Sequence, residues 1–188
     1  LPHTRGGFEA LEKSIDGSKE KARDPKSLLY IGWRRDASPW WHDKFCKDIG
    51  IERIGVLEIF PPNFHDLERR VTEGRYRVKP ILGDARKIDQ YTSPGEYDII
   101  FWDHGPEHVS LEDLQKVTPV LATYAGRMLL YCCPWGEWRQ GPEGSNLDEE
   151  HKNSVTPEQL INMGLHVMTF GESGQDKEGE LIAVYLKT

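Results

Sequence analysis

Short apolar runs alternate with helical segments five times along this chain, and a pair of strands closes the pattern. The apolar runs end at Gly or Pro turn signals, which is typical of buried strands. Alternation of strands and helices predicts a doubly wound parallel sheet, because each crossover helix returns the chain to the same end of the sheet. The predicted strands cover residues 27–32, 53–60, 77–82, 97–102 and 127–133.

Two further strands are expected near the end of the sequence. Residues 165–170 and 180–186 are joined by a polar, Gly-containing turn, which predicts an antiparallel hairpin. We therefore expect an α/β fold: a Rossmann-like, doubly wound, mostly parallel sheet of seven strands with an antiparallel C-terminal hairpin, in three α/β/α layers. Helices are predicted at residues 8–23, 42–49, 63–72 and 111–123, and from the N-cap Thr156 to Gly164.

The length of 188 residues predicts a single domain, 1–188, whose first 26 residues contain the N-terminal helix. A chain of this size buries roughly 70% of its unfolded surface, so its fold requires neither a disulfide nor a metal. Residues 134–155 form a long segment rich in Gly, Pro and charge. Long loops in compact domains are usually functional, and we expect this one to act as a lid or as part of a binding site.

The charge balance limits the partners. Lys and Arg number 24 against 31 Asp and Glu, a net charge of −7, which argues against nucleic acid and anionic membranes. No apolar run approaches the roughly 18 residues of a membrane span. The first residues show no signal-peptide pattern, and three cysteines without C-x-x-C spacing are typical of reduced thiols. We expect a cytoplasmic protein, and the sequence carries no signal of its oligomeric state.

Acids and tryptophans gather at the predicted strand ends, where ligands bind in open parallel sheets. Glu58 near the end of the second strand is placed to accept hydrogen bonds from a ribose diol. Asp84 follows the third strand, and Asp103 follows the fourth. We expect the tryptophans to form an aromatic wall facing a ligand, although packing alone would also explain each of them. They are Trp33, Trp40, Trp41, Trp102, Trp135 and Trp138.

The segment His104-Gly105-Pro106-Glu107-His108 matches the zinc-hydrolase pattern H-x-x-E-H. That pattern needs both histidines on one face of an α-helix. A helix here is expected to begin at Pro106, which leaves His104 outside it. A zinc hydrolase acting through His104, Glu107 and His108 is therefore the last of the alternatives, and we expect no metal site.

The turn after the first strand has a single glycine, Gly32, followed by Trp33. A pyrophosphate-binding turn needs the pattern G-x-G-x-x-G, so that the backbone can approach the phosphates. A nicotinamide or flavin dinucleotide therefore fits poorly. A ligand with adenine and ribose but no phosphate fits better.

Taken together, these residues resemble the class I S-adenosylmethionine (SAM)-dependent methyltransferases, over about residues 28–187. Residues 28–32 look like the strand and first glycine of that family's first motif, and residues 97–103 with Glu107-His108 look like its fourth. The segment from Gln140 to Pro157 resembles one found in some small-molecule methyltransferases. The terminal hairpin is what the family's antiparallel seventh strand would look like.

The resemblance implies a SAM cofactor and methyl transfer to a small molecule of unspecified identity. The family's first motif usually runs acid-x-Gly-x-Gly-x-Gly, whereas this chain has Tyr30 in place of the acid and only the first glycine. A non-catalytic SAM-binding or scaffold protein of the same fold is therefore the alternative. For a general base the candidates are His104, His108 and His151. The implied cofactor-binding residues are Tyr30, Gly32, Trp33, Glu58, Ile59, Gly83, Asp84, Ala85 and Asp103.

Overall fold

The computed structural model of the chain describes residues 25–33, 46, 50–173 and 179–187. The helix expected at residues 8–23, and all of the helix expected at 42–49 except Cys46, lie outside the described residues.

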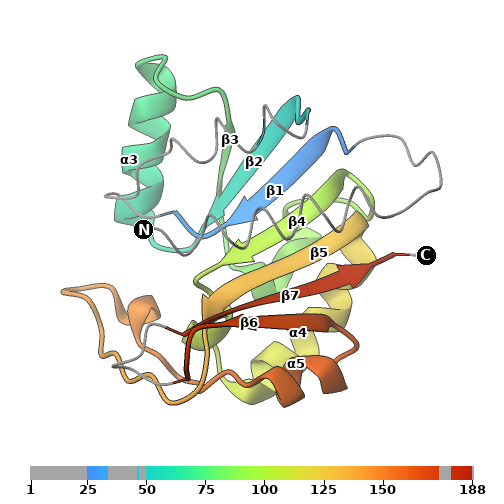
Figure 1. Cartoon of the computed structure of the whole chain (residues 1–188). Helices are drawn as coiled ribbons and strands as arrows, with labels where there is room; N and C mark the ends of the chain where they lie inside the picture. The colour runs from blue at the N-terminus through green and yellow to red at the C-terminus, as the bar shows by residue number, and fades with distance from the viewer. Residues whose placement is uncertain (1–24, 34–45, 47–49, 174–178, 188) are drawn as a thin grey trace.

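The strands in the described residues form one seven-stranded sheet in the order β3-β2-β1-β4-β5-β7-β6. The first five run parallel to one another, and β7 is antiparallel to both of its neighbours (Figure 1). This confirms the predicted doubly wound sheet and its C-terminal hairpin. The strands are β1 (Ser27–Ile31), β2 (Arg53–Glu58), β3 (Lys79–Leu82), β4 (Tyr97–Asp103), β5 (Ala125–Pro134), β6 (His166–Phe170) and β7 (Glu180–Leu186).

Two of the described α-helices begin at side chains that cap them. The Ser110 hydroxyl accepts a hydrogen bond from the Asp113 amide, and Thr156 forms a capping box with Gln159. One helix begins two residues before the predicted start, because its two prolines occupy first-turn positions where no N–H is needed. The helices are α3 (Pro61–Thr72), α4 (Leu111–Tyr124) and α5 (Pro157–Asn162), with short 3₁₀ turns η1 (Ala85–Gln90), η2 (Pro106–His108) and η3 (Leu147–Glu149).

Two apolar clusters cover the two faces of the sheet. On one face, Leu114 and Leu121 of α4 and Leu160 of α5 pack against strand residues such as Leu29. On the other face, Leu67 of α3 packs against the alternate strand residues. Successive residues of a strand point to opposite faces, so each buried strand contributes to both clusters and reads as a continuous apolar run. The result is the predicted three-layer arrangement (Figure 1).

The strand register brings several chain segments to one edge of the sheet. Ile31 of β1 pairs with Leu57 on one side and with Trp102 on the other. Glu58 in turn pairs with Leu82. Because these strands are parallel, the residues that follow them lie at the same edge. No helix among the described residues is long and apolar enough to cross a membrane.

Candidate functional site

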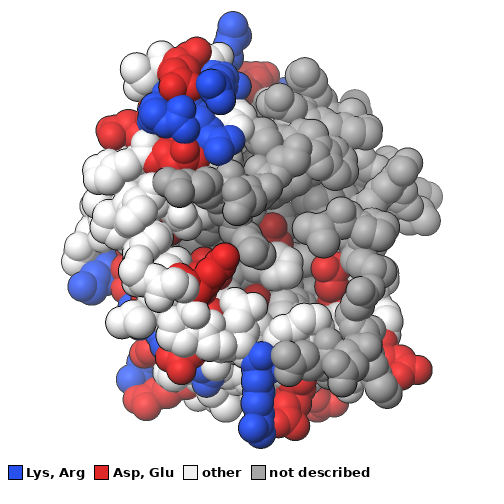
Figure 2. All heavy atoms as spheres, turned by 90° about the vertical axis from the view of Figure 1, so that its left-hand side faces the viewer, with Lys and Arg blue, Asp and Glu red and all other residues white. Residues whose placement is uncertain are grey.

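The turn after β1 is tight, and Gly32 makes it possible. Gly32 has a φ of +95°, and a Cβ at this position would lie 3.2 Å from the Asp103 carbonyl oxygen. Its amide donates to the Leu57 carbonyl at 2.9 Å. The chain therefore turns sharply at this point between β2 and β4, in a backbone conformation that favours glycine. Figure 2 looks onto this edge of the sheet, and acidic atoms are visible near the centre of the view.

Glu58 is the buried carboxylate at this edge, with 4% of its surface exposed. One oxygen accepts the Trp33 amide at 2.6 Å, and the other accepts the Phe60 amide at 2.7 Å. Burial, with a smaller contribution from the charges of Glu149 and Asp148, raises the pKa of Glu58 to about 7 against the lowering effect of these two amides. Each oxygen retains a lone pair for a further donor.

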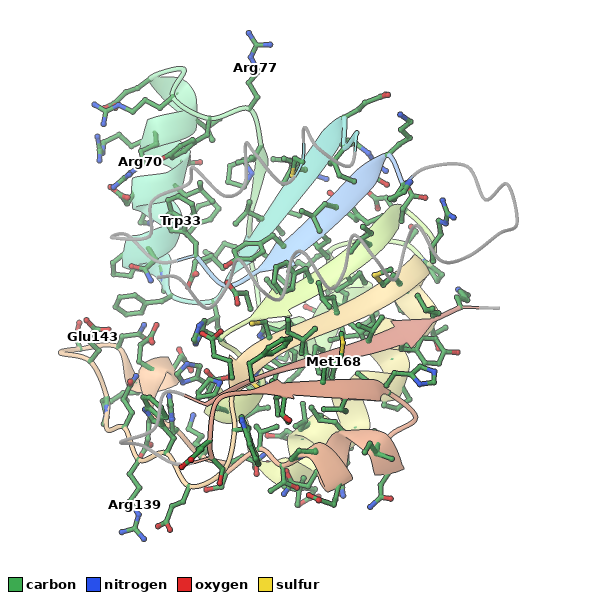
Figure 3. The ribbon with its side chains drawn as sticks, in the orientation of Figure 1. Trp33, Arg70, Arg77, Arg139, Glu143 and Met168 are labelled. Atoms are coloured by element: carbon green, nitrogen blue, oxygen red, sulfur yellow. The ribbon has the colours of Figure 1, made fainter. Side chains whose placement is uncertain are left out.

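The backbone of Trp33 is fixed from two directions. Its amide donates to Glu58, and its carbonyl accepts the side-chain amide of Asn63 at 3.0 Å. The indole packs edge-on against Tyr76 at 5.5 Å, with the Arg70 guanidinium 5.9 Å from its centre (Figure 3). This turn is therefore held by side chains of β2 and α3, although its sequence has only one glycine.

Two of the four described tryptophans, Trp33 and Trp102, belong to the core. Trp33 and Trp102 are 4% and 5% exposed and lie in the two clusters on opposite faces of the sheet. They therefore do not form the aromatic wall that their positions in the sequence predict. Trp40 and Trp41 lie outside the described residues.

Tyr30, at the family's acidic position, forms a buried pair with Asp103. The Tyr30 hydroxyl donates to the Asp103 carboxylate at 2.9 Å. Burial raises the pKa of both groups, and for Asp103 the charge of His104 and the hydrogen bond from Tyr30 offset part of that rise. The pair joins the end of β4 to β1 beneath the turn at Gly32.

Asp84 already has a partner at the end of β3. Its carboxylate accepts the amide of Arg86 at 2.9 Å and lies 2.7 Å from the guanidinium of the same residue. Partial burial raises the pKa of Asp84, but the contacts with Arg86 outweigh it and the net shift is downward. Nearby, Ala85 is buried, Ile59 is 37% exposed, and the Gly83 amide donates to the Glu58 carbonyl at 2.9 Å.

His104 follows β4 and is the one non-glycine residue in the described part of the chain with a positive φ, +46°. Its Nδ1 lies 3.4 Å from the Glu107 carboxylate, which is itself 2% exposed. Partial burial lowers the pKa of His104, but Glu107 and the charge of Asp103 outweigh it and raise the pKa to about 9. His104 is therefore protonated at neutral pH.

The turn Pro106–His108 is a short 3₁₀ helix and leaves His104 outside it, as Gly105 and Pro106 predict. The two histidines are therefore not one turn apart on an α-helix, which the zinc-hydrolase pattern needs. His108 instead meets His151, from the loop after β5, with ring centres 4.9 Å apart.

Backbone hydrogen bonds hold this loop against the turn. The amides of Lys152 and Asn153 both donate to the Glu107 carbonyl, at 2.9 and 3.2 Å. The His151 amide donates to the Gln140 carbonyl at 2.9 Å. The sequence predicts that His151 lies in a lid formed by residues 134–155. It does not predict the contact with His108, because no local sequence pattern encodes how a long loop packs against a distant turn.

Comparisons with known proteins give structural matches. No protein-family model matches the chain, and no curated protein does. A SAM-dependent methyltransferase from Aquifex aeolicus superposes with a TM-score of 0.58 at 16% identity, covering 94% of this chain and 88% of that one. Magnesium protoporphyrin IX methyltransferase from Synechocystis PCC 6803, determined with bound SAH, gives 0.57 at 13% identity, with coverages of 97% and 84%.

Mitomycin 7-O-methyltransferase MmcR gives a TM-score of 0.57 at 17% identity, covering 87% of this chain. The chain spans 49% of that enzyme. Identities this low show the fold alone. The strand order, the antiparallel β7 and these superpositions establish that the chain has the fold of the class I SAM-dependent methyltransferases.

Proposed function

We propose that this protein is a SAM-dependent methyltransferase that acts on a small molecule. The observation that carries the proposal is the placement of Glu58 at the end of β2. Its two oxygens are fixed by the amides of Trp33 and Phe60, and each keeps a lone pair for one hydroxyl of a ribose diol. The strand order reverses between β1 and β4, and an acid held in this way at the end of the next strand, β2, suits an adenosyl ligand.

The neighbouring strand ends suit the remainder of that ligand. Ile59 offers exposed apolar surface beside the adenine position, with Gly83 and Ala85 on the adjoining segment. Arg86 donates to both carboxylate oxygens of Asp84, so Asp84 would accept from the adenine amino group by giving up one of these contacts. The buried carboxylates of Glu58 and Asp103 lower the electrostatic cost of placing a cation at this edge.

The turn after β1 would hold the methionine end of the ligand. Gly32 and Trp33 form this turn, and the Tyr30–Asp103 hydrogen bond joins β1 to β4 next to it. The anchored Trp33 backbone supplies the rigidity that further glycines do not provide here.

SAM, when bound, supplies an electrophilic methyl group on a sulfonium. The chain would align the acceptor with that methyl group and exclude water, and we propose that the loop of residues 134–155 contributes to both tasks. An acceptor that must lose a proton needs a basic atom nearby. His104 is protonated at neutral pH. The rings of His108 and His151 each turn Nδ1 toward a backbone carbonyl, so that in the neutral ring Nε2 has the lone pair.

The alternative is a non-catalytic SAM-binding or scaffold protein of the same fold. The replacement of the family's acid by Tyr30, together with the single glycine of the first motif, favours it. Turnover separates the two functions: an enzyme converts SAM to SAH in the presence of its acceptor, whereas a binding protein holds SAM without consuming it.

Titration calorimetry with SAM and with SAH tests the proposal. We expect binding of both, and weaker binding by Glu58→Ala and Asp84→Ala. The matched control is Glu52→Ala at the opposite end of β2, where the exposed carboxylate contacts Lys26 at 3.2 Å. Absence of heat with either ligand would overturn the proposal, and equal binding by Glu58→Ala and Glu52→Ala would place the ligand elsewhere.

A further inference from the structure

Three potential metal ligands converge where the loop after β5 meets the turn after β4. Glu107 and His108 come from η2, and His151 comes from the loop. One ligand atom from each lies within 4.8 Å of the other two. In tetrahedral zinc sites with bonds of about 2.1 Å, ligand atoms are roughly 3.4 Å apart, so small side-chain rotations bring these three to one ion.

The hydrogen bonds of the two imidazoles fix which nitrogen can bind a metal. His108 Nδ1 lies 3.3 Å from the Glu150 carbonyl oxygen, and His151 Nδ1 lies 3.0 Å from the Trp138 carbonyl oxygen. A carbonyl only accepts, so in the neutral form of both rings Nδ1 carries the proton and Nε2 has the lone pair. Metal-binding histidines almost always have such an outer hydrogen bond, which sets the ring orientation and raises ligand basicity.

Glu107 supplies an anionic oxygen, and because this carboxylate is buried, a positively charged partner stabilises it. It is 2% exposed, and neither carboxylate oxygen makes a hydrogen bond of good geometry within the described residues. Its contacts are ion-pair distances: 3.4 Å to His104 Nδ1 and 3.9 Å to His108 Nε2. A buried charge is stable when it is paired or bound to a metal, so a cation between Glu107 and the imidazoles would satisfy it further.

Hydrogen bonds of the loop hold the three ligand residues close together. The amides of Lys152 and Asn153 fasten the loop to the Glu107 carbonyl. The Gln140 side chain donates to the Glu149 carbonyl at 3.0 Å, within the same loop. The Glu149 carboxylate lies 3.9 Å from His108 Nε2, so it is a second acid close to the ligand cluster.

We propose that Glu107, His108 and His151 bind one divalent transition-metal ion of the Zn²⁺ class. Two imidazoles and one carboxylate suit Zn²⁺, Co²⁺, Ni²⁺ or Fe²⁺, whereas Mg²⁺ and Ca²⁺ prefer oxygen ligands throughout. Three protein ligands leave at least one coordination position open, as in catalytic zinc sites. Metal binding can be measured without SAM, but a bound ion would occupy the Nε2 lone pairs of His108 and His151 that are considered above as bases. A role for the open position in holding an acceptor oxygen rests on the proposed function.

The test is equilibrium dialysis of untagged, chelator-treated protein against Zn²⁺, followed by elemental analysis, without SAM. We expect one equivalent of zinc, and a loss of affinity of at least about 10-fold in His151→Gln and in Glu107→Gln. The matched control is His166→Gln, an exposed histidine of β6, which should keep wild-type affinity. Co²⁺ absorption should report imidazole coordination in wild type and lose intensity in His151→Gln.

The variant His104→Gln separates this ligand set from the sequence pattern H-x-x-E-H. We expect it to retain the metal, because His104 is outside the proposed set. Loss of binding in His104→Gln with retention in His151→Gln would overturn the proposal, as would wild-type protein that binds no stoichiometric zinc. His151 lies in a loop, so circular dichroism of that variant should show intact folding, even if Glu107→Gln fails to fold. SAM calorimetry on the metal-free protein tests the proposed function separately.

Discussion

Glu58 makes stability depend on pH in the direction opposite to that of a salt-bridged carboxylate. Its pKa is about 7 in the folded protein, against 4.5 for an ordinary glutamate. The folded state therefore holds this proton more tightly than the unfolded state. The stability that the proton contributes is complete below about pH 4.5 and is lost as the pH rises through about 7.

The size of the effect follows from the shift. A difference of about 2.5 pKa units corresponds to about 3 kcal/mol, at about 1.4 kcal/mol per unit. Between pH 5 and pH 8 most of this appears, so Glu58 should lower the free energy of unfolding by roughly 2 to 3 kcal/mol over that interval. Other groups titrate over the same range, so wild type alone does not isolate the contribution of Glu58.

The variant Glu58→Gln isolates it. The amide cannot ionise, and its NH₂ group faces one of the two backbone amides that the carboxylate accepts. This contact lowers the free energy of unfolding of the variant by the same amount at every pH. It therefore cancels when the difference in free energy between wild type and variant at pH 5 is subtracted from the difference at pH 8. Urea denaturation at both pH values gives the four free energies, with Glu52→Gln as an exposed control. A difference between wild type and Glu58→Gln that does not change with pH would refute the reasoning.

Three further predictions concern the same framework. If SAM binds Glu58 through its ribose, binding at pH 6.5 should release up to one proton, because hydroxyl donors favour the ionised carboxylate. Calorimetry in buffers of different ionisation enthalpy measures this proton release, and Glu58→Gln should release none. Gly32→Ala should destabilise the protein by about 1–3 kcal/mol in urea denaturation, because φ is +95° and the new Cβ would lie 3.2 Å from the Asp103 carbonyl; an unchanged midpoint would contradict the turn geometry. Thr156→Ala should cost about 1 kcal/mol by removing the capping box with Gln159, and thermal melting with Thr156→Ser as the conservative control checks it.

The sheet was predictable because its signals are local. Each buried strand is an apolar run bounded by turn residues, and the run at Tyr97–Asp103 differs from the predicted strand by one residue. The first residues of α3 were missed, because Pro61 and Pro62 were read as the end of a strand although they also suit the first turn of a helix. The 3₁₀ turn at Ala85–Gln90 was missed, since such turns have no hydrophobic period.

The candidate site was predictable where topology alone decides position. The parallel order brings Glu58 and Asp103 to one edge. The pairing of Asp84 with Arg86 and the burial of Trp33 depend on tertiary packing, which strand-end position does not encode. The meeting of His108 with His151 depends on the path of a long loop, and its backbone hydrogen bonds leave no mark in residue types.

The position of β7 has a consequence for the order of folding. This strand lies between β5 and β6 and pairs with both, although it follows them in the chain. During synthesis, β5 and β6 therefore leave the ribosome before the strand that joins them. Until residues 180–186 emerge, β5 presents an unpaired edge along an apolar strand, which is a surface prone to association with other chains. Completion of the sheet thus depends on β7, which follows its other six strands in the chain.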